Sequence, residues 1–398
     1  MRRLLVIGAS SLQVPAIIKA KELGLCVAVA DYNPNAVGIQ YADEYYDAST
    51  VDPDAIYHAA KKFRANGIMT LATDMPMRSL AYACERLGLP GLSWDSALKA
   101  TDKGEMIRAF KAAEVNCPGF FIINSQDEFV DARNDFVYPL IIKPTDNSGS
   151  RGVILVERPE ELEKAFAYSS ENGRSGAVIV EEYMVGPEVS VEIIVLEGVP
   201  HVLQVTDKLT TGAPHFVEMG HSQPSSLNAG VLEEVRNLAS KAALAIGIQN
   251  GPAHAEIIVT ADGPKMVEIG ARLGGDCITT HLVPLSTGID MVEATIRIAL
   301  GEKPNIPAAL THGSAIRYLD TAPGAVESIS GIKDALSVPG VSDVKVNVCI
   351  GDVVGDMTSS LSRTGYVIAQ AADPKCALAA CEEAISRINI DVRADISE

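Results

Sequence analysis

The sequence lacks paired cysteines and long apolar runs. Its seven cysteines are scattered, odd in number and without a CxxC pair, which argues against disulfides or a zinc site and favours reduced thiols. No stretch approaches the roughly 18 consecutive apolar residues of a membrane span. The apolar run after the two N-terminal arginines ends at Gly8 and is too short for a signal peptide. We therefore expect a cytoplasmic protein.

Positive charge is also in short supply, since 33 Lys and Arg face 51 Asp and Glu and the net charge is −18. So acidic a chain is not attracted as a whole to nucleic acid or to anionic membranes, although a local basic pocket for phosphates remains compatible with it. A hydrophobic content of 47% in 398 residues is enough for several packed domains. We expect small-molecule partners, with no nucleic acid and no membrane.

The first 95 residues alternate between apolar runs and helical patterns. Residues 3–31 read as a β-α-β unit, which predicts a parallel sheet. Asp31 ends the second strand, as in dinucleotide-binding folds, but Gly8 does not begin a GxGxxG fingerprint. This disfavours an oxidoreductase. We predict a doubly wound, Rossmann-like domain over residues 1–95.

The most informative segment is residues 254–272, where two apolar-rich runs flank a turn and predict a β-hairpin. A three-residue loop would pair Thr260 with Pro264 and place Glu256 opposite Glu268. Directly opposed like charges destabilise strand pairing, so the two carboxylates indicate a bound cation. Carboxylates that leave room for water and phosphate oxygens suit Mg²⁺. The alternative is two exposed glutamates on a solvated hairpin.

Residues 145–152 form a glycine-rich loop between two predicted strands, with Lys143 before it and Arg151 inside it. Such a loop can direct backbone N–H groups at phosphate oxygens, but it lacks the GK[ST] of a Walker A motif. The alternative is a plain turn. Residues 208–224 are dense in histidine, glycine and proline, and we predict a shaped loop that carries ligand contacts.

Taken in order, these motifs resemble the ATP-grasp superfamily of carboxylate–amine and carboxylate–thiol ligases. The motifs are Thr101-Asp102-Lys103, Ile142-Lys143-Pro144 with the glycine loop, residues 180–192, Glu256 and residues 268–276. Residues 208–224, Arg317-Tyr318-Leu319 and Pro323-Gly324 are further similar to L-amino-acid ligases that make dipeptides, and the N-terminal part is similar to carbamoyl-phosphate-synthase-like proteins.

The resemblance implies a mixed α/β and α+β fold. A Rossmann-like domain over residues 1–95 precedes an ATP-grasp domain of two α+β lobes over residues 96–310, whose small lid lobe spans about residues 115–185. A small C-terminal α+β domain covers residues 311–398. The loop 145–152 is the predicted lid, because an acyl phosphate must be kept from water.

The resemblance also assigns roles to residues of this chain. It implies ATP binding by Lys103, Lys143, Ser148, Gly149, Ser150, Gly152, Glu181, Glu182, Tyr183, Met184 and Glu188. Glu256 and Glu268 would bind Mg²⁺ or Mn²⁺. Many members carry Asn where this chain has Gly270, which leaves open whether one or two metal ions bind.

Three residues are predicted on the substrate side. Arg272 would hold the transferring phosphoryl group or the substrate carboxylate, Glu218 a substrate ammonium, and His221 a proton or a carboxylate. For Glu218 and His221 the alternative is a structurally hydrogen-bonded loop.

The implied activity is that of an ATP- and Mg²⁺-dependent ligase. A carboxylate attacks the γ-phosphorus of ATP, and an amine then attacks the acyl phosphate, with ADP and phosphate as products. An amino acid or peptide is the expected substrate class. The alternatives are a ligase of the purine-biosynthesis or bicarbonate-activating type and a non-catalytic nucleotide-binding regulator. A homodimer is one assembly compatible with the sequence.

Overall fold

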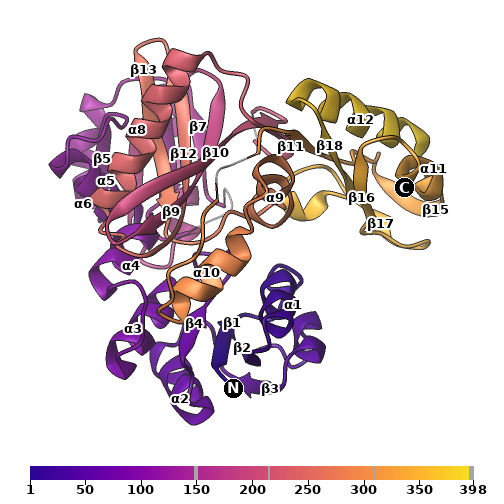
Figure 1. The fold of residues 1–398 in the computed structure, drawn as a ribbon. Coiled ribbons are helices and arrows are strands. Elements are labelled where there is room, and N and C mark those ends of the chain that lie inside the picture. The colour runs from indigo at the N-terminus through magenta and orange to yellow at the C-terminus, as the bar shows by residue number, and fades with distance from the viewer. Residues whose placement is uncertain (148–150, 214–215, 308–309, 394–398) are drawn as a thin grey trace.

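The computed structural model describes residues 1–147, 151–213, 216–307 and 310–393, which form four β-sheets with the helices around them (Figure 1). The N-terminal elements are β1 (Arg3–Ile7), α1 (Val14–Glu22), β2 (Cys26–Asp31), β3 (Glu44–Asp47), α2 (Pro53–Phe63), β4 (Gly67–Met69) and α3 (Met77–Leu87). Their strands are parallel, in the order β3-β2-β1-β4. Leu5 and Ile7 of β1 pack in the same core as α2 and α3, whereas Leu4 and Val6 face α1. Helices thus cover both faces, as predicted for a doubly wound sheet.

Two helices connect this sheet to the rest of the chain, α4 (Trp94–Thr101) and α5 (Lys103–Ala112). The motif Thr101-Asp102-Lys103 spans the break between these two helices. The Asp102 carboxylate accepts a hydrogen bond from the Glu105 N–H at 3.0 Å and caps the start of α5. Lys103 is therefore the first residue of a new helix, and its side chain reaches the site described below.

A four-stranded antiparallel sheet forms a lobe with its own core. Its elements are β5 (Phe120–Ile123), α6 (Gln126–Ala132), β6 (Leu140–Pro144), β7 (Ile154–Val156), α7 (Leu162–Glu171) and β8 (Val178–Glu182). The strands follow the order β5-β8-β6-β7. Phe129 stacks on Phe166 with ring centroids 4.1 Å apart inside this core. The predicted phosphate loop connects β6 to β7, and its residues 148–150 lie outside the described residues.

The largest sheet has eight strands in the order β13-β12-β9-β10-β11-β14-β18-β16. Its elements and flanking helices are β9 (Glu188–Leu196), β10 (Val199–Thr210), β11 (Glu218–Gln223), α8 (Ala229–Ala245), β12 (Gly251–Thr260), β13 (Gly263–Gly270), α9 (Val283–Thr287), α10 (Met291–Ala299), β14 (Gly313–Tyr318), β16 (Val341–Val346) and β18 (Gly365–Ala371). Helix α8 lies across β9, β10, β12 and β13 (Figure 1). Pairing of β11 with β14 carries the sheet into the C-terminal part of the chain.

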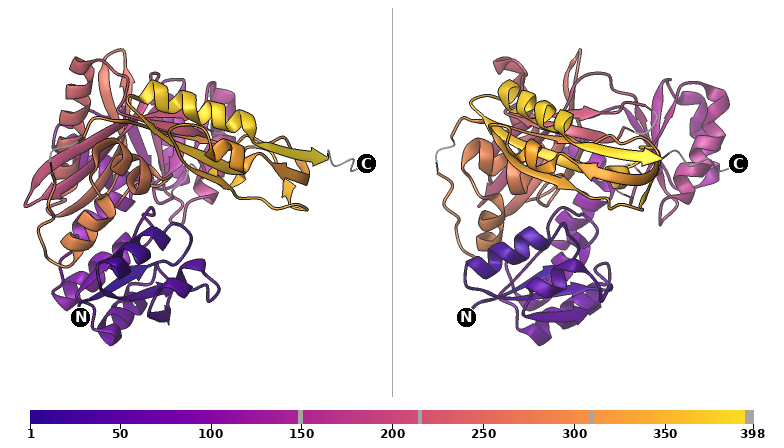
Figure 2. Two further views of the ribbon diagram at one scale, coloured as in Figure 1. Left: turned by 45° about the vertical axis from the view of Figure 1, so that its right-hand side comes forward. Right: turned by 90° about the vertical axis from the view of Figure 1, so that its right-hand side faces the viewer.

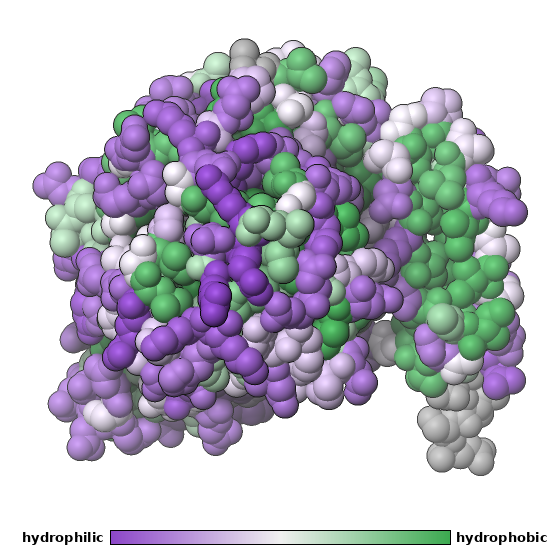
Figure 3. Space-filling view, turned by 60° about the horizontal axis from the view of Figure 1, so that its bottom comes forward, coloured by the Kyte–Doolittle hydropathy of each residue, from purple (hydrophilic) through white to green (hydrophobic). Residues whose placement is uncertain are grey.

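The remaining elements lie at the far end of this sheet. They are β15 (Gly324–Ser330), α11 (Ile332–Leu336), β17 (Val353–Val354), α12 (Pro374–Arg387) and β19 (Asn389–Arg393). Helix α12 packs on β14 and β18, and the three strands form a small sheet that projects away from the N-terminal sheet (Figure 2). Apolar side chains gather over this C-terminal part on the right of Figure 3, whereas the rest of that face is largely hydrophilic. No helix within the described ranges is long and apolar enough to cross a membrane.

The hairpin of β12 and β13 confirms the central prediction and corrects its turn. Glu256 and Glu268 are partners in the ladder, as expected. Near the turn, however, Thr260 pairs with Gly263 and not with Pro264, so the loop has two residues. An irregularity after Glu256 absorbs the one-residue difference. Without this irregularity, the change of one residue in the register would have placed the side chains of one strand on the opposite face of the sheet.

Strand β11 was missed by the sequence analysis. The end of the segment predicted as a loop pairs with β10 on one side and β14 on the other. Its sequence, EMGHSQ, has no apolar alternation, although its last four residues are buried. The Gln223 side chain, for example, donates to Thr206 Oγ1 of β10 at 2.9 Å. Only the flanking strands supply the partners that make this segment extended.

Candidate active site

Each of the two opposed carboxylates already has a lysine partner. Lys103 Nζ lies 2.9 Å from Glu268 Oε2, and Lys208 Nζ lies 3.1 Å from Glu256 Oε2. Lys103 lowers the pKa of Glu268 against the effect of burial. These two lysines therefore offset the repulsion between the two glutamates, from which a bound cation was inferred in the sequence. Within the described part of the chain, no group of three or more His, Cys, Asp or Glu could hold a metal ion by itself.

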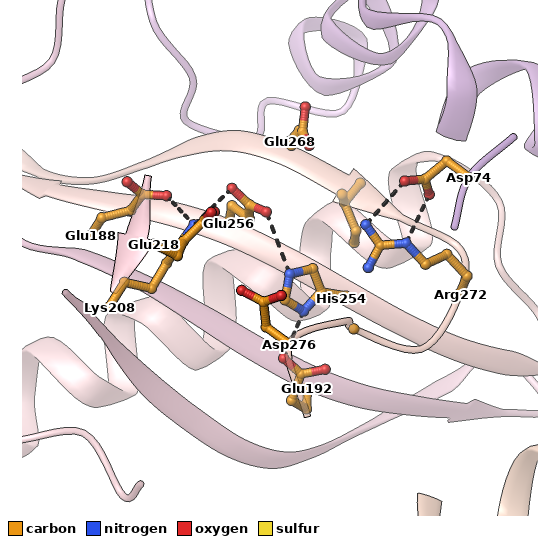
Figure 4. Close-up of polar contacts among 12 residues, drawn as sticks. Asp74, Glu188, Glu192, Lys208, Glu218, His254, Glu256, Glu268, Arg272 and Asp276 are labelled. Atoms are coloured by element: carbon orange, nitrogen blue, oxygen red, sulfur yellow. Dashed lines mark hydrogen bonds and ion pairs between the residues drawn. The ribbon is translucent and has the colours of Figure 1, made fainter. Parts of the chain in front are cut away.

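Lys208 is the centre of an acidic cluster that the sequence analysis did not recognise. Its ammonium lies 2.5 Å from Glu188, 3.1 Å from Glu256 and 3.6 Å from Glu218, and its side chain is 5% exposed (Figure 4). Burial would lower the pKa of Lys208, but the three carboxylates outweigh it and hold the pKa well above its ordinary value. Lys208 is consequently a permanent cation that holds Glu188, and the predicted role of Glu188 in ATP binding stays a prediction.

A buried histidine, His254, contacts both Glu256 and the buried Glu192. His254 Nδ1 lies 2.6 Å from Glu192 Oε1, and His254 Nε2 lies 3.4 Å from Glu256 Oε1 (Figure 4). The ladder sets His254 directly opposite Glu192. Burial disfavours a charged imidazole, yet Glu192 and Glu256 raise its pKa to about 9. For Glu256, Lys208 and His254 overcome the effect of burial and hold the pKa well below its ordinary value.

Arg272 is paired with a residue of the loop between β4 and α3. Its Nε and Nη2 each donate to the Asp74 carboxylate at 3.0 Å (Figure 4). A Cβ atom on residue 270 would lie 2.7 Å from Asp74 Oδ1 and 3.1 Å from Arg272 Nε. The Asp74–Arg272 pair thus occupies the space that a side chain at position 270 would need, which fits glycine at this position.

A cavity of about 310 Å³ opens beside these pairs. Its lining includes Asp74, Arg78, Lys103, Asp146, Arg174 and Glu268. These residues come from the segment between β4 and the end of α3, the start of α5, the lobe built on β5 to β8, and the hairpin, so four separate segments of the chain meet at one polar cavity. Its volume lies in the range of small-molecule sites.

The predicted nucleotide residues lie mainly on the lid lobe. Lys143 Nζ lies 2.6 Å from Glu181 Oε2, with both side chains buried, and Lys265 binds both Glu182 oxygens at 3.0 Å. The charge of Lys143 also contributes to the lowered pKa of Glu268, after Lys103. This links the lid lobe to the hairpin electrostatically.

Other nucleotide predictions concern backbone positions. Tyr183 and Met184 directly follow β8, where the Tyr183 N–H donates to the Pro139 carbonyl at 3.3 Å. Gly152 has a φ of +79°, and a Cβ there would lie 2.7 Å from Pro144 Cγ. This position requires glycine. Ser148, Gly149 and Ser150 lie outside the described residues, and their predicted roles stay predictions.

Glu218 and His221 both belong to β11, but only one of them faces the open site. The Glu218 side chain is 27% exposed beside Lys208. The His221 side chain is 2% exposed, and its Nε2 lies 3.3 Å from Asp276 Oδ2. Asp276, which is 25% exposed, is held in turn by Arg363. In this arrangement Asp276 lies between the buried His221 and the solvent. Asp276 was not predicted as a site residue, although it ends the motif of residues 268–276.

Comparison with known proteins defines the class to which this fold and site belong. Residues 136–280 match the ATP-grasp domain family, and residues 317–393 match the L-amino acid ligase C-terminal domain 2. Residues 136–280 therefore contain an ATP-grasp domain, and residues 317–393 contain a domain of the L-amino acid ligase type. The chain is an ADP-forming carboxylate–amine ligase that uses ATP with Mg²⁺.

Individual relatives come from more than one branch of these ligases. The chain is 28% identical to a formate-dependent phosphoribosylglycinamide formyltransferase of Burkholderia pseudomallei, covering 85% of this chain and 84% of the relative. It is 27% identical to the alanine–anticapsin ligase of Bacillus subtilis, and the match covers 74% of this chain and 66% of the relative. The fold is similar to that of the L-amino acid ligase from Bacillus licheniformis, with a TM-score of 0.85 at 22% identity over 99% of both chains.

Proposed function

We propose that this ligase joins a carboxylate to the amine of an amino acid or peptide. The charge balance around Lys208 carries the proposal. Three carboxylates surround this one ammonium, which leaves the cluster net negative. A surplus of negative charge favours a cationic amine substrate over a phosphorylated one.

The nearby cations support the same conclusion. Lys103, Arg272 and Arg363 each hold a carboxylate, those of Glu268, Asp74 and Asp276 respectively. A substrate phosphate that used one of these three cations would have to displace its carboxylate. The ammonium of a zwitterionic amino acid can instead bind Glu218 while Glu218 keeps its contact with Lys208 at 3.6 Å.

The opposed carboxylates fit Mg²⁺ as the ATP-bound cation. Mg²⁺ is usually held by one or two protein carboxylates together with phosphate oxygens and water, and Glu256 and Glu268 supply that donor set. When bound, Mg²⁺ would neutralise charge on the phosphates of ATP. Glu268 and Glu256 are both held ionised by neighbouring cations, so each can bind a metal without first losing a proton.

The residues of this chain then act mainly by position and charge. Lys103 and Lys143 bind the phosphates, and Arg272 orients the carboxylate or the transferring phosphoryl group. Glu218 receives the ammonium of the second substrate. In phosphoryl transfer the protein needs to supply no nucleophile, since the substrate carboxylate attacks the γ-phosphorus. The loop 145–152 is the proposed cover that keeps water from the acyl phosphate.

A second candidate is a ligase that acts on an aminoribonucleotide or on bicarbonate. The similarity to the Burkholderia phosphoribosylglycinamide enzyme favours it, because that relative matches 85% of this chain. The match of residues 317–393 to the L-amino acid ligase C-terminal domain 2 favours the amino-acid substrate.

A phosphate-release assay separates the two candidates. The purified chain with MgATP is offered all pairs of proteinogenic amino acids, and in parallel glycinamide ribonucleotide with formate, aminoimidazole ribonucleotide with bicarbonate, and bicarbonate alone. We expect phosphate release with a subset of amino-acid pairs, and a product mass equal to their sum minus water. Release with a ribonucleotide or bicarbonate, and with no amino-acid pair, would refute the proposal.

A further inference from the structure

The C-terminal part of the chain places one arginine inside the substrate side of the site. Arg363 precedes β18 and follows a short 3₁₀ turn over Ser360–Ser362. Its side chain is 10% exposed. None of the roles assigned above explains why this guanidinium is buried next to Glu218 and Asp276.

Arg363 has an unusually complete set of partners. Its Nη1 and Nη2 donate to Asp276 Oδ2 and Oδ1 at 2.7 and 2.8 Å. Its Nη1 also donates to the Glu218 carbonyl at 3.2 Å, and its Nε donates to the Ser360 carbonyl at 2.9 Å. The guanidinium carbon lies 3.7 Å from the centre of the Tyr318 ring. Because these contacts point in different directions, the guanidinium has one orientation.

The aspartate that it holds lies on a strained stretch of backbone. Asp276 and Cys277 have φ angles of 51° and 61°, in the left-handed region that non-glycine residues rarely adopt. Such a conformation persists only when the surroundings fix it, and it is common at functional sites. Arg363 and His221 hold the Asp276 carboxylate from two sides. A π-helical turn over Ile278–Leu282 follows directly.

The Arg363 guanidinium therefore links two segments of the chain, each of which carries a partly exposed carboxylate. It binds the Asp276 side chain and the Glu218 backbone, while Ser360 Oγ donates to Glu218 Oε2 at 3.3 Å. We propose that Arg363 is a positioning residue, which fixes the spacing of Glu218 and Asp276 so that both carboxylates receive the ammonium group of the amine substrate. Arg363 itself does not contact the substrate.

The kinetic part of this inference rests on the proposed function, so two independent measurements test it. The variants are Arg363→Ala, Arg363→Lys and the matched control Arg393→Ala. Arg393 lies in the same part of the chain, is 71% exposed and pairs with Glu327 at 3.4 Å. The first measurement is steady-state phosphate release with the amino-acid pair that the wild type uses fastest, together with displacement of a fluorescent ATP analogue.

Arg363→Ala should raise the KM for the amine substrate and lower kcat/KM about 100-fold, since misplacement of a substrate by about 1 Å can cost that much. Affinity for MgATP should stay within about twofold, because Arg363 touches no predicted nucleotide residue. Millimolar guanidinium should partly restore Arg363→Ala. Arg363→Lys should be intermediate, because a lysine keeps the charge but not the two-pronged contact. Arg393→Ala should match the wild type.

The second measurement needs no substrate. Burial raises the pKa of the Cys277 thiol to about 12, so this thiol should alkylate slowly in the wild type. Peptide mass spectrometry after iodoacetamide treatment measures its rate. Loss of Arg363 should release residues 276–277 and accelerate labelling of Cys277 about tenfold or more. Arg393→Ala should leave the rate unchanged.

Three results would overturn the inference. The first is an unchanged Cys277 labelling rate in Arg363→Ala, which would show that Arg363 does not hold the segment. The second is faster labelling with an unaltered KM for the amine. The third is a loss of MgATP affinity as large as the loss of kcat/KM. If no amino-acid pair drives phosphate release in the wild type, the proposed function fails, and the labelling experiment alone decides the role of Arg363.

Discussion

Glu256 and Glu268 face each other in one ladder, but their surroundings differ. Glu256 is tied to Lys208 and, through His254, to the buried Glu192. Glu268 is tied to Lys103 and borders the cavity shared with the N-terminal sheet. One carboxylate is thus built into a buried charge network, and the other lies where separate parts of the chain meet. We infer that Glu256 contributes to stability and catalysis together, whereas Glu268 serves catalysis with less structural consequence.

The largest expected effect sharpens this contrast. Glu268→Gln and Glu256→Gln should each reduce phosphate release about 100- to 1,000-fold, because each removes a charge that the ATP-bound cation would use. Only Glu256→Gln should also lower the melting temperature clearly, since it leaves Lys208 and His254 with less compensation. Phosphate release over a range of Mg²⁺ concentrations and thermal unfolding check this. Normal Mg²⁺-dependent turnover in Glu268→Gln would contradict the metal assignment.

Replacement of Lys208 tests the buried charge network around Glu256. Lys208→Met leaves Glu188, Glu218 and Glu256 close together without a cation, and removing one partner of a buried pair costs about 3–5 kcal/mol. Lys303→Met is the control, because its pair with Glu197 at 3.3 Å is exposed and should cost less than about 1 kcal/mol. Denaturant unfolding measures both. Equal stability of the two variants would mean that the cluster is not a structural unit.

His254 gives the buried network a pH signature. Its pKa rises from 6.5 to about 9 on folding, so the folded state retains a proton that the unfolded state loses. The resulting stabilisation, about 3 kcal/mol, is complete below pH 6.5 and disappears as the pH rises through 9. Unfolding free energies measured without Mg²⁺ and nucleotide should therefore decline over this window. His254→Gln should flatten the decline, and the exposed His201 should be replaceable by Gln without altering it.

The smallest effect concerns the Asp74–Arg272 pair. A methyl group at position 270 would meet Asp74 Oδ1 at 2.7 Å, whereas one at position 275 has its nearest neighbour, Ala72 Cβ, at 3.8 Å. Gly270→Ala should displace Arg272 by a few tenths of an ångström and slow turnover about tenfold or less. Gly275→Ala should be close to wild type. If both variants behave alike, the contact with Asp74 does not position Arg272.

Much of the architecture was predictable from local patterns. Alternating apolar runs and helical patterns indicated the parallel N-terminal sheet, which the structure confirms. The opposition of Glu256 and Glu268 was also correct, although the turn was wrong by one residue. Strand β11 could not be predicted, because its pairing depends on β14, which comes about 90 residues later in the sequence.

By itself the sequence determined the order of motifs and the ladder position of the two glutamates, because each depends on residue type and short-range periodicity. The class of chemistry was implied by the resemblance of these ordered motifs to ATP-grasp ligases. Only the tertiary structure decided which charges meet. Asp74 pairs with Arg272, and Arg363 pairs with Asp276, although each pair is far apart in the sequence. Lys208 likewise lies close to three carboxylates from other strands. Sequence spacing carries no information about such contacts, since strand pairing and packing bring together side chains that lie far apart in the sequence. Lys208 and its three carboxylates, for example, lie on four strands of the same sheet. The side of the site that we propose for the amine therefore depends on the fold.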